Sequence, residues 1–269
     1  MLNWVLKFLI ICPLLEATKI LWGINKNENR LNRNTNLIPR GGALGDLHLT
    51  LSNRTSRVYR IVSNETVYSN YRTVILRTVE HSISKYSGEE IRSNVTYDLI
   101  AHKGTESAAI IVAWNTTSKT VTLVEEYHPG PNSRLVGPAA GLVDPIKHRL
   151  PEGSEEIEKD FDMALIAARW EMEEELRLKG GTWHRLTNAP AYMDKYVICR
   201  VYPFLCIDPE RVEHDKQLPR DKEEEHDMEI LCNITVPELI EMISTGEMNL
   251  VGSWTCLLAI QKLRDIGEI

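Results

Sequence analysis

The chain has 269 residues, of which 43% are hydrophobic and 7% aromatic, and this composition is typical of a globular protein with a buried core. It excludes a chain that is mainly disordered. The formal net charge of −7 excludes the basic surface that binding to a phosphate backbone requires, so we expect no nucleic-acid partner. Acidic clusters favour divalent metal ions as partners instead.

The first residues, MLNWVLKFLIICPLLEATKILW, are mostly apolar and have about the length of a secretory signal. We expect residues 1–22 to be a signal peptide that sends the chain into the secretory pathway, either for secretion or to an organelle. An uncleaved membrane anchor is the alternative, because the run is almost long enough to span a bilayer, and it would be the only membrane contact. Residues 23–70 begin with an asparagine-rich stretch of low apolar content, and we expect a flexible leader there.

Two stretches of the sequence predict β-hairpins. Apolar residues alternate over residues 71–100 around a turn at YSGEE, and we take residues 71–105 as a small N-terminal antiparallel β subdomain. The runs SAAIIVAW and TVTLVEEY flank the turn residues NTTSK. The first of these runs is continuously apolar, which is typical of a strand buried on both faces. It would belong to the core sheet of a second domain, residues 106–269.

The second domain should alternate strands with helices. The segment PAAGLVDP is punctuated by glycine and proline, and predicts a loop with a short strand close to a ligand or a helix. The other expected elements are a helix from Asp160 to the stop at Gly180 and Gly181, strands over 195–207 and 228–236, a helix from Pro237 to Gly246, and a last helix from Ser253. This order predicts an α/β fold, a helix–sheet–helix sandwich with a mixed sheet.

Four cysteines remain beyond the expected signal peptide, and they are Cys199, Cys206, Cys232 and Cys256. Their spacing matches no zinc pattern, and each lies in an apolar segment. Buried free thiols are therefore the expected state of these side chains.

The helix expected from Asp160 carries a cluster of glutamates at residues 171–175. On a helical wheel Glu171, Glu174 and Glu175 share one flank, beside the apolar flank that faces the core. Three carboxylates within one turn repel one another, and a bound cation would offset that repulsion. Oxygen ligands without histidine or cysteine suit a hard cation such as Mg²⁺, with Mn²⁺ as a possible substitute. By pattern alone, a solvated acidic helix face is the commoner explanation.

The segment AARWEMEEELRLKGGTW resembles the signature helix of the Nudix hydrolases, G-x5-E-x7-R-E-U-x-E-E-x-G-U. The flanking segments VTLVEEYHPG, GPAAGLVDP and EILCNITVPELIEMISTGEMNLVGSWTCLLAI resemble the ADP-ribose pyrophosphatase branch of that family. The resemblance implies the same helix–sheet–helix sandwich and a homodimer to which the N-terminal β subdomain contributes. It also implies Mg²⁺-dependent hydrolysis of the diphosphate bond in ADP-ribose or a related nucleoside diphosphate sugar.

The resemblance implies metal ligands at the side chains of Glu171, Glu174 and Glu175 and at the backbone carbonyl of Ala140. Glu174 is in addition a candidate catalytic residue. Gly141, which follows Ala140, is a candidate substrate-binding residue in the same loop.

Three further site residues are expected outside the signature. A loop glutamate often serves as the base in the branch that the chain resembles, and the resemblance implies Glu225, with Glu224 as second choice, as the catalytic base. An acidic loop is more often only solvated. His128 is a candidate substrate contact in place of an arginine, with a surface turn as the alternative. Tyr192 is a candidate for the wall of the substrate pocket, and simple packing of its loop is equally compatible with the sequence.

The chain departs from the family signature at several positions. Trp170 stands where arginine precedes the first glutamate, Arg177 replaces the signature glycine, and Gly137 replaces a glutamate. The insertion IKHRLPEGSEEIEK, residues 146–159, interrupts the motif. These departures support a second hypothesis, a Nudix-fold protein that has lost turnover and acts as a binding or interaction module.

Overall fold

The structure is a computed structural model that describes residues 55–85, 88–149, 159–220 and 227–269. The expected signal peptide at residues 1–22 and the leader up to residue 54 lie outside the described residues, as do Glu224 and Glu225. Within the described ranges, no helix has the length and apolar character needed to cross a membrane.

The N-terminal β subdomain is a long antiparallel sheet. It contains β1 (Thr55–Ser69), β2 (Arg72–Lys85) and β3 (Glu90–His102), and the short strand β11 (Val197–Ile198) pairs with β3 in parallel. The pairing of β2 with β3 confirms the first predicted hairpin. The subdomain starts earlier than predicted, because β1 occupies residues where the flexible leader was expected to extend to residue 70. That part of the prediction was wrong, since β-branched and aromatic residues of β1 suit a strand that β2 pairs along its whole length.

The second sheet is mixed and has the order β10-β12-β4-β5-β14. Its main strands are β4 (Ser107–Asn115), β5 (Thr120–His128), β12 (Arg200–Ile207) and β14 (Glu229–Thr235). The shorter strands are β6 (Ser133–Gly137), β7 (Ala139–Leu142), β9 (Thr182–Arg185) and β10 (Ala191–Tyr192), and β8 (Leu178–Lys179) pairs with β13 (Glu210–Arg211) in a separate two-stranded sheet. Strands β4 and β12 are parallel, and the other pairs in this sheet are antiparallel. The α/β class and the mixed sheet are therefore confirmed.

Two strand predictions need correction. Strands β4 and β5 form the expected hairpin only near the turn, because β7 pairs with β4 farther along the strand. The single strand expected over 195–207 is broken at Cys199, and its two pieces, β11 and β12, belong to different sheets.

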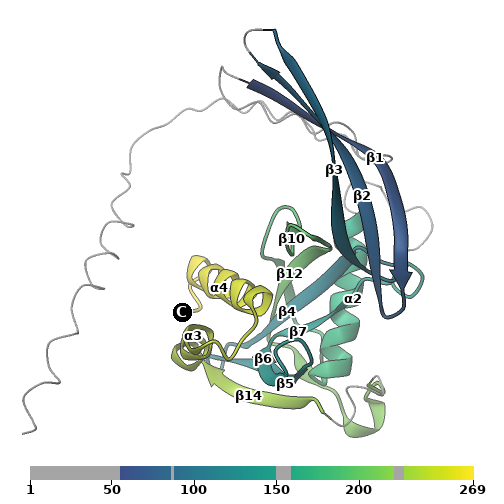
Figure 1. The fold of residues 1–269 in the computed structure, drawn as a ribbon. Helices are drawn as coiled ribbons and strands as arrows, with labels where there is room; N and C mark the ends of the chain where they lie inside the picture. The colour runs from purple at the N-terminus through teal and green to yellow at the C-terminus, as the bar shows by residue number, and fades with distance from the viewer. Residues whose placement is uncertain (1–54, 86–87, 150–158, 221–226) are drawn as a thin grey trace, which may run out of the picture. The chain divides into compact units, whose positions relative to one another are not determined.

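Helices cover both faces of the mixed sheet (Figure 1). Helix α2 (Lys159–Glu175) lies on one side, and α3 (Val236–Thr245) and α4 (Leu250–Asp265) lie on the other. Strand β4 separates two hydrophobic clusters, because Ala109 and Ile111 pack with α2 whereas Val112 and Trp114 pack with α3 and α4. Alternate residues of a strand point to opposite faces, so a continuously apolar β4 is what this central position requires.

The helix boundaries follow local capping. Helix α3 agrees with the prediction, with a capping box at its start and Gly246 in the left-handed conformation at its end. Helix α4 begins at Leu250 rather than Ser253, because the side chain of Asn249 accepts the N–H of Gly252 as an N-cap. Helix α2 ends at Glu175, short of the predicted glycine stop, and Arg177 follows with φ of 60°.

The cysteines are free, and Cys199, Cys206 and Cys256 are buried as expected. Burial raises the pKa of Cys256 to about 12, which keeps this thiol protonated and unreactive at neutral pH. Cys232 is exposed, contrary to the prediction. The pairing of β14 with β5 shifts its register between Leu231 and Ile234, which accounts for the outward position of the residues between them.

Candidate active site

The three signature glutamates lie in the last turns of α2, next to residues that pack into the core. Met172 between them is 1% exposed. Glu174 is 7% exposed and Glu175 is 4% exposed, so the solvated-face explanation is wrong for these two side chains. Carboxylates withdrawn from water need compensating partners, since burying an unpaired charge is costly.

Glu171 lies directly against Gly141 of β7. A Cβ added to Gly141 would be 2.0 Å from Cδ and Oε1 of Glu171. Atoms that are not bonded to each other cannot approach so closely, so the carboxylate occupies the space that any side chain at Gly141 would fill. The absence of a side chain at position 141 is what allows helix α2 to bring this carboxylate onto β7.

Glu175 reaches the same strand one residue earlier, where its Oε2 accepts the N–H of Ala140 at 3.0 Å. Ala140 is opposite Ile110 in β4, and Val143, three residues later, donates its N–H to Ser107 of β4. In antiparallel strands, residues that bond to the partner strand alternate with residues that do not. Since Val143 bonds to β4, Ala140 does not, and both its N–H and its C=O point away from β4. The carbonyl of Ala140 therefore faces the side on which Glu175 lies.

Glu174 has a cation beside it that comes from the insertion. Lys147 Nζ lies 3.9 Å from Glu174 Oε2 and 5.1 Å from the centre of the Trp170 ring. Trp170 stands where the family signature has arginine, and its ring faces attract an ammonium group. Lys147 of the insertion thus places a positive charge next to Trp170, the residue that stands in place of the signature arginine.

Two arginines lie at the end of α2, and one of them, Arg220, bonds to the last residue of the helix. Arg220 donates to the carbonyls of Glu175, at 2.8 Å, and Met228, at 3.0 Å, while Arg177 donates to the carbonyl of Leu218. Cations near the last carbonyls of a helix compensate its dipole. Burial, followed by the nearby Arg220, lowers the pKa of Arg177, and the carboxylate of Glu174 opposes that change.

The chemical types of the donor atoms at this site are those that a hard divalent cation prefers. They are carboxylate oxygens of Glu171, Glu174 and Glu175 and one inward-facing carbonyl, of Ala140, without histidine or cysteine. Among the described residues, no three His, Cys, Asp or Glu side chains are gathered closely enough to form a ready metal site.

The structure brings Glu171 onto Gly141 and Glu175 onto Ala140, through contacts between α2 and β7. Glu174 is buried in the same turn of α2, with Lys147 beside it. Sequence reasoning missed the roles of Lys147 and Arg220. Lys147 lies a few residues after β7, but this position does not mark its contacts, because they depend on the path of the insertion. No sequence pattern marks Arg220, because its partners are backbone carbonyls distant along the chain.

The other predicted site residues are not joined to this group by described contacts. His128 ends β5, and its Nε2 lies 3.4 Å from Glu126 Oε1 of the same strand. Tyr192 is 77% exposed and lines a separate cavity of about 480 Å³ with Tyr97 and Tyr196. The roles of His128, Tyr192 and Glu225 stay predictions.

No protein-family model matches the chain, and no curated protein matches it either. A solved structure of an ADP compounds hydrolase is similar at 17% sequence identity with a TM-score of 0.49, over 78% of this chain and 97% of that chain. This similarity is too distant to transfer a residue role or an activity to the chain.

Proposed function

We propose that the chain is a divalent-cation-dependent hydrolase of the Nudix type, acting on the diphosphate bond of ADP-ribose or a related nucleoside diphosphate sugar. The observation that carries the proposal is the meeting of α2 with β7, where Glu171 lies on Gly141 and Glu175 bonds to Ala140. Glu174 is buried in the same turn of the helix. The signature resemblance assigns metal binding to these same positions.

Each residue has a distinct part in the proposed reaction. Glu171, Glu174, Glu175 and the carbonyl of Ala140 would hold Mg²⁺, or Mn²⁺ in its place, and the bound cation would neutralise the diphosphate and acidify an attacking water. Gly141 leaves room for the Glu171 carboxylate, and Arg220 holds the last turn of α2. Glu225 is the proposed base, because a carboxylate within reach of the water could accept its proton.

The function is tested by incubating the full chain with ADP-ribose and Mg²⁺ and measuring AMP. We expect AMP to appear with Mg²⁺ and to be suppressed when the cation is removed by chelation. Absence of nucleoside monophosphate from every member of a panel of nucleoside diphosphate sugars would contradict the proposal.

A binding module without turnover is the second candidate function. The observation that favours it is the ammonium of Lys147 beside Glu174, because a fixed positive charge there can take the place of the metal ion. The two candidates differ in their affinity for metal. Calorimetry that detects no heat of Mg²⁺ or Mn²⁺ binding, combined with no hydrolysis, would favour the module.

We predict that Lys147→Gln increases the affinity for Mn²⁺ by about two- to fivefold, the range expected for one partly exposed ion pair. The ammonium competes with the cation for Glu174, and its removal abolishes that competition. Lys119→Gln is the control, because Lys119 is also an exposed lysine in an ion pair, with Glu268. Calorimetry measures both, and an unchanged or weaker affinity in Lys147→Gln would show that Lys147 does not compete.

We also propose a homodimer formed through one face of the N-terminal sheet. The strand registers place apolar residues of three strands on that face, namely Ile61, Val79, Ile83, Ile91 and Val95. Ile91 is 40% exposed and Val95 is 36% exposed. A second copy of the chain would cover such a face, since contiguous exposed apolar surface is typical of interaction sites.

A lysine on this face should separate the dimer. We predict that Val95→Lys is monomeric at concentrations where the wild-type chain is dimeric, because association would bury the new charge. Thr96→Lys is the matched control, since the next residue of β3 points to the opposite face. Light scattering coupled to size exclusion gives the masses, and a dimeric Val95→Lys variant would rule out this face.

A further inference from the structure

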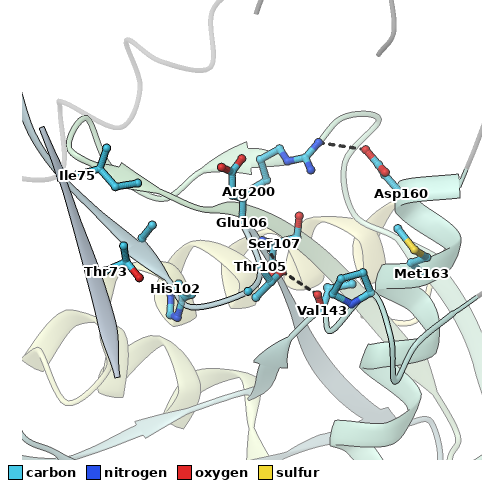
Figure 2. A pocket seen from close by; sticks show the side chains of 13 residues that line it. Thr73, Ile75, His102, Thr105, Glu106, Ser107, Val143, Asp160, Met163 and Arg200 are labelled. Atoms are coloured by element: carbon cyan, nitrogen blue, oxygen red, sulfur yellow. Dashed lines mark hydrogen bonds and ion pairs between the residues drawn. The ribbon is translucent and has the colours of Figure 1, made fainter. Parts of the chain in front are cut away.

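A second cavity, of about 500 Å³, lies at the start of α2 (Figure 2). It is bordered by Thr73 and Ile75 of β2, by Ser107 at the start of β4, and by Asp160 and Met163 of α2. Its volume is within the usual range for small-molecule sites. None of these residues is a proposed metal ligand, and none stands at a position for which the signature motif specifies a residue.

The wall of the cavity offers both hydrogen-bond donors and acceptors. Figure 2 shows Arg200 extending from β12 to Asp160, with an Nη1 to Oδ2 distance of 3.0 Å, and Glu106 and Ser107 beside it. Because one guanidinium nitrogen bonds to Asp160, other donors of Arg200 are left for a ligand. Burial, and then the neighbouring Arg72, lower the pKa of His102, so this imidazole is neutral at pH 7.

The phenol of Tyr202 lies close to Ser107 and has no hydrogen-bond partner among the described residues. This side chain is 1% exposed. A buried hydroxyl without a partner is costly. A ligand hydroxyl bound to Ser107 could extend a hydrogen-bond network to this phenol.

The chemistry of the wall selects a class of ligand. Two carboxylates, Glu106 and Asp160, outnumber one guanidinium, so the lining disfavours a phosphate. The described lining contains no phenylalanine, tyrosine or tryptophan, whose large rings are the usual platforms on which nucleobases stack. Carboxylates accept hydrogen bonds from hydroxyl groups, and arginine and serine can donate to them. A neutral ring with several hydroxyl groups satisfies all of these groups.

The cavity is close enough to the glutamates to hold part of the same substrate. Val143 lines it and is two residues beyond Gly141, where Glu171 lies, so β7 connects the two places over about 7 Å. Along α2, Met163 precedes Glu171 by eight residues, which is a rise of about 12 Å.

We infer that this cavity binds the sugar of a nucleoside diphosphate sugar, with Glu106 and Asp160 accepting from its hydroxyls and Arg200 and Ser107 donating to them. The inference rests on the proposed function for the rest of the substrate. The cavity would then accept the sugar of a nucleoside diphosphate sugar and reject the second nucleoside of a dinucleotide, because that nucleoside carries a base.

The test follows the methionine methyl signals by NMR with ribose 5-phosphate as probe and no divalent cation. At about 10 mM, enough to saturate a site with a Kd of about 1 mM, we expect the Met163 signal to shift and the Met172 signal to stay. Inorganic phosphate should move neither. Met163→Leu assigns the signal. An unmoved Met163 signal, or an equal shift with phosphate, overturns the inference.

Glu106→Gln should weaken the affinity for ribose 5-phosphate, measured by titrating the Met163 shift, by about tenfold. The loss of one charged hydrogen bond is of that order. Glu241→Gln, an exposed change on α3, is the control and should leave the response unchanged. Equal responses in wild-type chain and Glu106→Gln would remove Glu106 from the site and overturn its assignment.

The two proposals fail separately. If the chain releases no AMP from ADP-ribose but ribose 5-phosphate still shifts Met163, the hydrolase proposal fails and the cavity assignment stands. If AMP is released and Met163 does not respond, the cavity assignment fails alone.

Discussion

Glu174→Gln should lower the rate of AMP release from ADP-ribose by at least about 100-fold. A metal ion stabilises the transition state of such a reaction by several kcal/mol, and each 1.4 kcal/mol corresponds to about tenfold in rate. The melting temperature should stay nearly the same or rise. Glutamine has nearly the shape of glutamate. The change removes the charge of a side chain that is only 7% exposed, and with it the repulsion from Glu171 and Glu175. Initial rates and thermal unfolding measure the two effects.

Glu173→Gln is the matched control, because Glu173 belongs to the same turn but not to the flank shared by the other three glutamates. It should retain the wild-type rate within about twofold, as expected for a surface change of a few tenths of a kcal/mol. A Glu174→Gln variant with the wild-type rate would remove Glu174 from the mechanism. Equal losses in both variants would mean that general acidity of the helix, and not a particular carboxylate, is what matters.

Gly141→Ala should weaken the affinity for Mn²⁺ by about 10- to 100-fold, the usual effect of disturbing the support of a metal ligand. The new methyl group would take the position of the Glu171 carboxylate, which lies 2.0 Å from it. The folded chain should tolerate the change, because the displaced atoms are the end of a flexible side chain. Calorimetry gives the affinity, and thermal unfolding shows whether the fold is intact.

Gly137→Ala is the control for the backbone effect of replacing glycine. A Cβ at Gly137 would meet no atom within 4 Å, and neither glycine has a positive φ. Both variants lose the same freedom in the unfolded chain, so their stabilities should change alike. The idea that Gly141 makes room for Glu171 fails if both variants bind Mn²⁺ as the wild-type chain does.

The mixed sheet and its helices could be predicted because local signals agreed with the tertiary arrangement. The continuous apolar run of β4 predicted burial on both faces, and Pro237 and Gly246 marked the two ends of α3. Strand β1 was missed because polar residues interrupt its β-branched and aromatic ones and because it follows an asparagine-rich stretch. Its pairing with β2 along the whole strand depends on the tertiary arrangement, which a single stretch of sequence does not show.

At the candidate site, the helical period was sufficient to group Glu171, Glu174 and Glu175, and the resemblance added Ala140 and Gly141. The contacts of Lys147 with Glu174 and Trp170 could not be predicted, because they depend on the path of the insertion after β7. Arg220 was missed for a similar reason. It donates to the carbonyl of Glu175, which is 45 residues earlier in the chain. Helix and strand periodicity relates only residues of the same element, so it does not predict such a contact.

We propose that the glutamates at the end of α2 hold a divalent cation against a diphosphate. The most direct measurement is anomalous scattering from a crystal of the chain grown with Mn²⁺ and a non-hydrolysable ADP-ribose analogue. A peak about 2.1 Å from carboxylate oxygens of Glu171, Glu174 or Glu175, next to the diphosphate, is the expected result. A diphosphate bound elsewhere, or no peak among these oxygens, would show that these glutamates do not hold the catalytic cation.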